Sequence, residues 1–210
     1  MTSGPQVFIV DDDASVRKSL ERLIRSARLR VETFASANAF LEREVYEAPC
    51  CLVLDVQMPG LNGLELQRVL AEQRRTIPIV FMTEHGDIPM GIQAMKDGAV
   101  DFLPKPFEAR DLLTAVRLAI EKDTLAKRKQ ANRADFQRHV ETLTPREHEV
   151  FRWVITGMLN KQIAYELDAS EKTVKVHRGR VMHKLKVGSV AELVRLAEKV
   201  DVTPPNVRRA

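Results

Sequence analysis

The sequence predicts an α/β domain, a doubly wound five-stranded parallel sheet, followed by a small all-α helix-turn-helix domain. Strand-like and helix-like segments alternate five times within residues 1–122, which is the pattern of a parallel sheet covered by helices. Residues 140–200 contain helical patterns only. The formal charge also changes sign, from −3 over residues 1–122 to +7 over residues 123–210. This asymmetry indicates two domains, the second of which faces a polyanion.

The composition is that of a globular protein with a packed core. Hydrophobic residues make up 44% of the 210-residue chain, which excludes wholesale disorder. No apolar run approaches the roughly 18 residues that cross a bilayer, and the N-terminus lacks the features of a signal peptide. We therefore expect a cytoplasmic protein with no membrane partner. Cys50 and Cys51 are adjacent within an apolar run, so we expect them in the core rather than in a disulfide or a metal site.

Short apolar or alternating runs mark five strands, and apolar residues at helical spacing mark the helices between them. The expected strands are residues 6–10, 30–34, 50–54, 78–82 and 100–103. The expected helices are residues 16–27, 36–45, 63–73, 87–96 and 112–120. Ser36 and Asp87 are expected N-caps, because their side chains can accept hydrogen bonds from free helix N–H groups, and Gly98 is expected to end the fourth helix.

The stretch that ends at Asp55 organises the first domain. An unbroken apolar run over residues 50–54 stops at this carboxylate, and a Pro59-Gly60 turn follows. Such a run suits a strand that is buried on both faces. Asp55 would then lie at the carboxyl end of the strand, where open α/β sheets form their sites. A lone Asp can instead cap the next turn or helix, so the other strand ends decide between the two interpretations.

Polar residues follow three of the other strands in the same way. Asp11 and Asp12 follow the first strand, Thr83 ends the fourth and Lys105 follows the fifth. A turn hydroxyl or a solvated charge explains any one of them, and we expect Asp13 to be only the cap of the first helix. Polar residues at the ends of four strands are harder to explain by coincidence, so the sequence favours one cleft that they share.

The grouping indicates phosphoryl chemistry. Carboxylates that lie close together repel one another unless a cation joins them, and hard oxygen ligands suit Mg²⁺. Asp55 would be the nucleophile that accepts a phosphoryl group as an acyl phosphate. Mg²⁺ and Lys105 would neutralise the charge on the transferring group, and the Thr83 hydroxyl could hydrogen-bond a phosphate oxygen.

These positions resemble the receiver domain of two-component response regulators. The likeness covers about residues 5–122 and rests on Asp11-Asp12, on Asp55 in a D-x-x-M-P-G sequence, on Thr83, and on Lys105-Pro106-Phe107. It implies that Asp55 is the phosphoacceptor and receives its phosphate from a histidine kinase.

The same resemblance implies further roles. Mg²⁺ would be held by Asp12, Asp55 and the backbone carbonyl of Gln57, with Asp11 assisting. Thr83 and Phe102 would form a switch pair, in which phosphate draws the hydroxyl inward and the ring follows. A cis peptide bond is expected before Pro106, as such bonds serve tight geometry.

A phosphatase with an aspartyl nucleophile is the competing enzyme interpretation. Phosphatases of the haloacid dehalogenase type place a second Asp two residues after the nucleophile as a general acid. Here that position is Gln57, whose amide cannot exchange protons in this role. We therefore expect a regulator and not an enzyme, with only self-phosphorylation and self-dephosphorylation at Asp55.

The second half begins with a polar segment at residues 123–139. This segment has no Pro or Gly and consists mostly of helix formers, so we expect a charged helical linker that acts as a solvated spacer. Thr144, Pro145 and Glu147 then form a helix start with a capping box. The expected DNA-binding domain spans residues 140–200, and residues 201–210 are expected to be a loose tail.

A short helix from Asn160, a tight turn at residues 168–170 and a helix capped by Ser170 predict a helix-turn-helix. The outer face of the last helix is basic and could insert into a major groove. A solvated amphipathic helix remains the alternative. The capped start, the turn and the basic helix together favour DNA binding.

Residues 143–200 resemble the LuxR-type DNA-binding domain, through Leu143 to Glu147, Asn160 to Ala164 and Thr173 to His177. With a receiver domain before the DNA-binding domain, the chain is similar to the NarL/FixJ class. Within this class it most resembles FixJ and regulators of aromatic catabolism. The resemblance implies the DNA-contact residues Lys161, Lys172, Thr173, Lys175, Val176, His177 and Arg180.

The expected function is a phosphorylation-controlled transcriptional regulator. Phosphate on Asp55 would shift the Thr83 and Phe102 region and expose a receiver dimer surface near residues 87–107. The homodimer would bind double-stranded promoter DNA and act on RNA polymerase. A receiver that acts through protein contacts without DNA binding is the alternative. A sigma-factor-like promoter subunit is disfavoured by the acidic cleft.

Glu84 departs from the receiver pattern, which usually has Ala or Gly after the threonine. We hypothesise that its charge or bulk at the mouth of the cleft slows the entry or loss of a phosphoryl group. Glu84→Ala should therefore accelerate phosphorylation, dephosphorylation or both, measured as rates of phosphate incorporation and loss. Unchanged rates in both directions would rule the hypothesis out.

Overall fold

The computed structural model describes residues 4–84, 88–200 and 202–205. By its internal contacts the chain divides into two compact units, residues 1–128 and residues 129–210. Each unit is described by itself below. Within the described residues no helix is long and apolar enough to cross a membrane.

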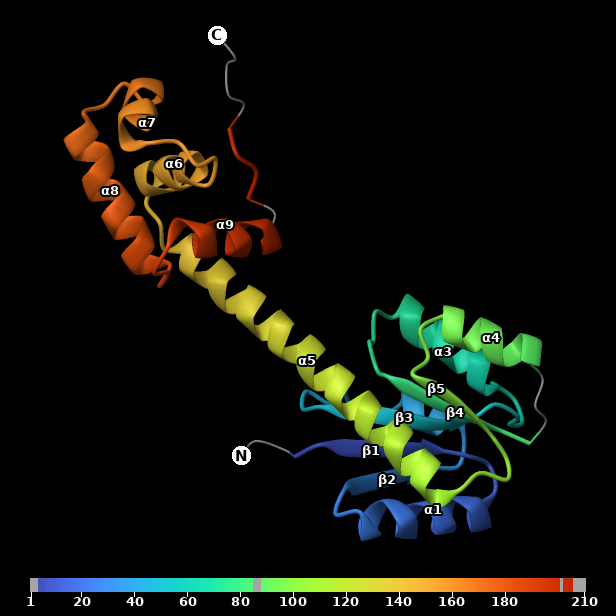
Figure 1. Cartoon of the computed structure of the whole chain (residues 1–210). Coiled ribbons are helices and arrows are strands. Elements are labelled where there is room, and N and C mark those ends of the chain that lie inside the picture. Colours follow the sequence, from blue (N-terminus) through green and yellow to red (C-terminus); the bar gives the residue numbers. More distant parts are fainter. Residues whose placement is uncertain (1–3, 85–87, 201, 206–210) are drawn as a thin grey trace. The chain divides into compact units, whose positions relative to one another are not determined.

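The first unit is a doubly wound five-stranded parallel sheet with the strand order β2-β1-β3-β4-β5, as the sequence predicted (Figure 1). Its strands are β1 Gln6–Val10, β2 Arg30–Phe34, β3 Cys50–Asp55, β4 Ile79–Thr83 and β5 Asp101–Pro104. Its helices are α1 Ala14–Ser26, α2 Ala37–Leu41, α3 Gly63–Glu72, α4 Ile88–Lys96 and the first part of α5 Ala109–Glu141. One apolar core joins the sheet to α1 and α5, and another joins its opposite face to α2, α3 and α4.

The register of the central strands sets the position of the polar residues that follow them. In β1 and β3 the apolar side chains are buried, because helices cover both faces of the sheet. Val10 pairs with Leu54 in this register, so the carboxyl ends of the two strands lie level with each other. Asp11 and Asp55 come directly after this pair and therefore meet at one edge of the sheet.

The expected helix over residues 36–45 is wrong at its C-terminal end, because α2 stops at Leu41. Arg75 donates from Nη1 to the carbonyl of Leu41 at 3.3 Å and from Nη2 to that of Arg43 at 3.4 Å. The guanidinium of Arg43 lies 3.8 Å above the ring of Phe8. These distant partners stabilise an irregular segment where local sequence favours a longer helix. The expected cap at Asp87 falls outside the described residues.

In the described residues, the second unit contains helices only: the end of α5, α6 Pro145–Val154, α7 Asn160–Glu166, α8 Glu171–Lys184 and α9 Val190–Lys199. The expected caps are present, since Thr144 forms a capping box with Glu147 and Ser170 Oγ accepts from Thr173 N at 3.1 Å. Residues 123–139 are part of the uninterrupted helix α5. Phe136 and Val140, near its end, pack into the core of this unit.

A buried ion pair joins the start of α6 to the end of α8. Glu147 is 3% exposed, and its Oε2 accepts from Lys184 Nζ at 2.6 Å and from Thr144 N at 2.9 Å. Lys184 also donates to the Thr142 carbonyl at 3.1 Å. The hydrogen bond from Lys184, followed by that from the Thr144 backbone, lowers the pKa of Glu147 to about 2.

This pair should make the stability of the second unit depend on pH. Because the pKa of Glu147 lies below its ordinary 4.5, the pair stabilises the fold above about pH 4.5, and this contribution is lost as pH falls toward 2. Lys184→Met should lower the free energy of unfolding at pH 7 by about 2 kcal/mol and flatten the pH dependence.

Urea unfolding followed by the fluorescence of Trp153, which lies in this core, measures both effects. Lys172→Met removes an exposed lysine from the same helix and should behave like the wild type. A pH profile that Lys184→Met leaves unchanged would contradict the role of the pair.

Candidate functional site

Two buried carboxylates meet one ammonium group at the carboxyl edge of the sheet. Asp55 is the last residue of β3 and is 4% exposed, while Asp11 follows β1 and is 1% exposed. Lys105 follows β5, and its Nζ lies 3.0 Å from Asp55 Oδ1 and 3.2 Å from Asp11 Oδ2. The structure thus brings together three of the predicted site residues, although 94 positions separate Asp11 from Lys105.

The loop after β1 is held by hydrogen bonds on both sides of Asp11. Asp11 Oδ1 accepts from Asp13 N at 2.9 Å, and the Asp11 carbonyl accepts from Arg17 Nη1 at 2.7 Å. Asp13 caps α1 as predicted, because its Oδ1 accepts from the backbone N of Ser15 and of Val16. Sequence reasoning missed Arg17, whose guanidinium places a positive charge beside the acidic loop.

Gly63 lets α3 begin directly against the backbone of Asp55. A Cβ at this position would collide with the Asp55 carbonyl oxygen, and the Gly63 N–H donates to the Val56 carbonyl at 3.0 Å. Asn62 and Glu65 form the capping box that starts the helix here. Because Gly63 has no side chain, α3 can begin close to the end of β3, where Asp55 lies. The sequence predicted only that a helix begins at Gly63.

The remaining predicted cleft residues lie around this centre. Asp12 and Gln57 are exposed in the loops after β1 and β3, and Glu84 is exposed just after β4. Thr83 is buried at the end of β4, and its carbonyl accepts from the Lys105 backbone N at 2.6 Å. The peptide bond between Lys105 and Pro106 is cis, as expected.

Phe102 lies on β5, half-buried between the sheet and α4. Its ring centroid is 6.3 Å from that of Phe81 in a tilted arrangement. A Cβ at Gly91 would lie only 3.1 and 3.2 Å from two ring carbons of Phe102. Gly91 therefore provides the space on α4 in which this ring lies.

The electrostatics of the cleft are unbalanced toward negative charge. Burial raises the pKa of Asp55, and the charges of Asp11 and Asp12 act in the same direction against the opposing effect of Lys105. Burial acts to lower the pKa of Lys105, but its hydrogen bond with Asp55 and the charge of Asp11 outweigh this and raise it. A divalent cation would relieve the repulsion between the carboxylates.

The donor set fits a cation that retains waters. Among the described residues, no group of three or more His, Cys, Asp or Glu side chains is placed to hold a metal ion. The two buried carboxylates of Asp11 and Asp55, with the exposed Asp12 in the loop after β1, match Mg²⁺, which takes one or two carboxylates and keeps several waters.

In the second unit, α7, a tight turn and α8 form the predicted helix-turn-helix. Asp168 adopts φ +46 in the turn, and the Ala169 N–H donates to the Ala164 carbonyl at 2.9 Å. His177 is half-buried, and its Nδ1 is buried without a hydrogen-bond partner among the described residues. The other predicted DNA-contact residues are all exposed: Lys161 on α7, and Lys172, Thr173, Lys175, Val176 and Arg180 on α8.

Arg178 has a role that sequence reasoning missed. Its Nη1 donates to Asn160 Oδ1 at 2.9 Å, so it joins α8 to the first residue of α7. This hydrogen bond fixes the angle between the two helices from within the unit, whereas the neighbouring basic side chains of α8 face solvent.

Comparison with known proteins identifies both domains. Residues 7–117 match the family of response regulator receiver domains, and residues 141–197 match the luxR family of bacterial regulatory proteins. The chain belongs to the response regulators of the NarL/FixJ class. It is a transcriptional response regulator with an N-terminal receiver domain and a C-terminal DNA-binding domain.

Relatives of this response regulator match over nearly its whole length. Nodulation protein W of Bradyrhizobium diazoefficiens is 48% identical over 94% of this chain and 87% of that protein. Response regulator protein TmoT of Ectopseudomonas mendocina is 48% identical over 92% of this chain and 88% of that protein. The structure of the response regulator StyR has a TM-score of 0.82 and 49% identity, covering 94% of this chain and 100% of the other.

Family membership places broad limits on the chemistry. Receiver domains take part in phosphotransfer from histidine kinases and generally bind Mg²⁺, and luxR-family domains bind DNA. Proteins built from these two domains are regulators rather than enzymes in general.

The unbalanced charge predicts that Asp55 lowers the stability of this regulator. Because burial and its acidic neighbours raise the pKa of Asp55, the ionised side chain costs stability at pH values above that pKa. Asp55→Asn should increase the free energy of unfolding at pH 7 by about 1 kcal/mol, and the gain should shrink as pH falls.

Calorimetry of the full chain between pH 7 and pH 4 measures this effect. Glu72→Gln removes an exposed carboxylate from α3 and should leave the stability unchanged. A lower stability in Asp55→Asn at pH 7 would contradict this account of the cleft.

Proposed function

We propose that Asp55 accepts a phosphoryl group from a histidine kinase, and that the phosphorylated protein dimerises on promoter DNA and contacts RNA polymerase. One observation carries the first step: a single ammonium group, Lys105 Nζ, joins the carboxylates of Asp55 and Asp11 at the edge of the sheet. A nucleophile needs such a positive charge beside it when phosphate arrives.

In the proposed transfer, an Asp55 carboxylate oxygen attacks the phosphorus of a kinase phosphohistidine. The P–N bond breaks, the imidazole leaves with its electron pair, and Asp55 becomes an acyl phosphate. Asp12, Asp55 and the Gln57 carbonyl would hold Mg²⁺, with Asp11 assisting, and the ion would supply charge neutralisation. Lys105 would move from a bond with the free carboxylate to a bond with the phosphate.

The response would pass through Thr83 and Phe102. Thr83 is buried at the end of β4, and its carbonyl accepts from the Lys105 backbone N, which supports a link between this residue and Lys105. Phe102 lies in the space left by Gly91, so a ring movement would change the surface of α4. Ile92 and Met95 on this helix are 51% and 45% exposed, which supports a dimer surface near residues 87–107.

DNA binding would use the exposed face of α8 together with the start of α7. Lysine and arginine side chains would contact phosphates and make affinity depend on salt, while side chains at base edges would select the sequence. Val176 is 47% exposed among charged neighbours, which suits contact with a thymine methyl group. The predicted set is Lys161, Lys172, Thr173, Lys175, Val176, His177 and Arg180.

Asp55→Asn should keep the fold but abolish dimerisation stimulated by a phosphoryl donor, because the amide cannot form an acyl phosphate. Sedimentation with Mg²⁺ and a small acyl-phosphate donor measures dimerisation. Binding to a pool of genomic DNA fragments, followed by sequencing, measures site selection. The wild type should enrich a paired site only with the donor.

Glu72→Gln changes an exposed carboxylate on α3, outside the proposed dimer surface near residues 87–107, and should respond to the donor like the wild type. Donor-stimulated dimerisation of Asp55→Asn would refute the role of Asp55. Equal enrichment of one site with and without the donor would show DNA binding that Asp55 does not control.

A further inference from the structure

The part of α5 just before the boundary between the units is attached to the sheet by polar contacts. Asp123 is 2% exposed, and its Oδ2 accepts from the Cys50 backbone N at 2.8 Å. The same oxygen lies 2.9 Å from Nζ of Lys127, one turn further along the helix. Cys50 is the first residue of β3, the strand that ends at Asp55. These residues were expected to begin a solvated spacer, so the structure gives them a different role.

Lys127 completes this attachment with bonds to the segment that leads into β3. Its Nζ donates to the Ala48 carbonyl at 2.6 Å and to the Tyr46 carbonyl at 3.2 Å. The ammonium group therefore has three oxygen partners for its three N–H donors. Tyr46 in turn donates from its hydroxyl to the Gly4 carbonyl at 2.7 Å, just before β1. The helix is thus bonded to the segments that begin the two central strands.

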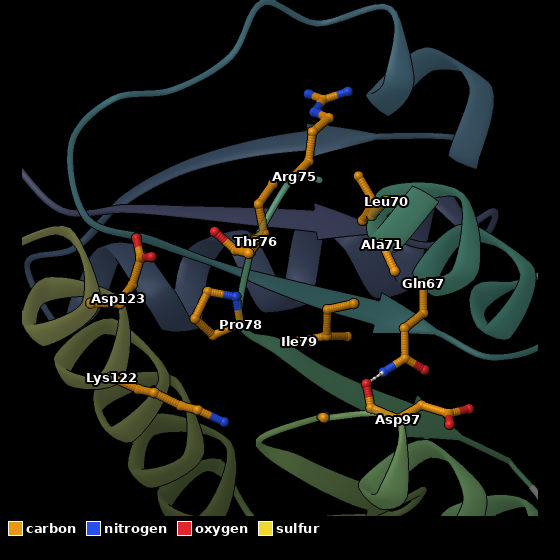
Figure 2. Close-up of a pocket in the computed structure, with 13 residues that line it drawn as sticks. Gln67, Leu70, Ala71, Arg75, Thr76, Pro78, Ile79, Asp97, Lys122 and Asp123 are labelled. Atoms are coloured by element: carbon orange, nitrogen blue, oxygen red, sulfur yellow. Dashed lines mark hydrogen bonds between the residues drawn. The ribbon is translucent and has the colours of Figure 1, made fainter. Parts of the chain in front are cut away.

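Apolar packing is incomplete on one side of this attachment. A cavity of about 270 Å³ lies between α5 and the start of β4, and Asp123, Lys122 and Ala126 form its α5 wall. Figure 2 shows Asp123 and Lys122 on the helix, facing Pro78, Ile79 and other residues across this space. Apolar packing holds the earlier turns of α5 through Leu112, Val116 and Ala119, whereas the turns beside this pocket are held in addition by the bonds of Asp123 and Lys127.

We propose that the Asp123–Lys127 pair is a coupling anchor, which fixes the rotation and register of α5 as it leaves the receiver. The proposal rests on the function proposed above and adds the element through which phosphorylation affects DNA binding. Helix α5 continues without interruption to Glu141, and its last turns belong to the core of the DNA-binding unit. In this proposal the pair, in which Asp123 is buried and the Lys127 side chain is 28% exposed, sets the position of the helix, since its partners lie at fixed places on the domain.

Lys127→Met tests the anchor by removing the ammonium group while it keeps most of the apolar side chain. Phosphate incorporation at Asp55 and donor-stimulated dimerisation should match the wild type, because Lys127 lies at the opposite edge of the sheet from the cleft. The donor-induced gain in affinity for the selected paired site should fall at least about fivefold, the lower end of typical coupling between sites. Fluorescence anisotropy with the labelled duplex measures this gain.

Lys129→Met is the matched control, since it removes an exposed lysine from the same helix and should keep the full gain. Amide hydrogen exchange should also increase at residues 42–50 and 121–128 in Lys127→Met and remain unchanged around Asp55. Asp123→Asn is the milder variant if Lys127→Met does not fold. Its amide can still accept from the Cys50 N–H but has no charge for Lys127, so it should lose part of the gain.

The outcomes separate the two proposals. If the wild type gains affinity with the donor and Lys127→Met gains as much, the anchor is wrong and the proposed function stands. If the wild type gains nothing, the proposed function fails and the anchor fails with it. If Lys129→Met loses as much of the donor-induced gain in DNA affinity as Lys127→Met does, the effect comes from the charge of the helix, and the anchor is wrong.

Discussion

Two buried carboxylates repel each other in the receiver domain, and the charges of the protein do not fully relieve this repulsion. Asp11 and Asp55 are held close together at the edge of the sheet, and one ammonium group, on Lys105, partly neutralises them. Burial raises the pKa of Asp55, so the ionised acid is less favourable in the fold than in water. The surrounding structure maintains this arrangement: the register of β1 and β3, the Arg17 bond to the Asp11 carbonyl, and the close approach of Gly63 to Asp55. A divalent cation would relieve this excess of negative charge, and the arrangement therefore favours its binding at this edge of the sheet.

Much of this arrangement could be predicted because its signals are local. Apolar runs mark the strands, side chains such as Asp13, Thr144 and Ser170 mark helix starts, and the topology of a parallel sheet then gathers the residues at its carboxyl edge. The sequence did not predict where α2 ends. Arg75, more than 30 positions away in the sequence, donates hydrogen bonds to the carbonyls of Leu41 and Arg43 at this end. The support of the cleft by Arg17, the bond from Arg178 to Asn160 and the burial of Asp123 were missed for a related reason. Each is a charged or polar side chain whose neighbours in the sequence give no sign of its partner in the fold.

Charged residues have different roles in the two domains. The charge pattern of the sequence alone therefore did not show the role of each charged residue. In the receiver the carboxylates of Asp11 and Asp55 are buried, whereas in the DNA-binding domain several cations of α8, among them Lys172, Lys175 and Arg180, are exposed. Some basic residues of the second domain serve structure instead: Arg178 joins two helices, and Lys184 neutralises the buried Glu147. A count of lysines and arginines gives the sign of the surface charge, but only the fold separates the exposed side chains from those that hold the helix-turn-helix together.

Helix α5 shows how buried polar groups can serve communication between domains. A ligand can shift an equilibrium only through an element that has distinct states, and packed elements move between discrete arrangements rather than continuously. The bonds of Asp123 and Lys127 make one such arrangement specific, because each group has defined partners and the buried carboxylate of Asp123 would lose its charge partner if the helix moved. The pocket beside them leaves the turns around Asp123 less closely packed than the earlier turns of α5. The same strand carries Asp55 at its carboxyl end and the bond to Asp123 at its amino end, so in the proposed mechanism the phosphoacceptor and the helix share one support.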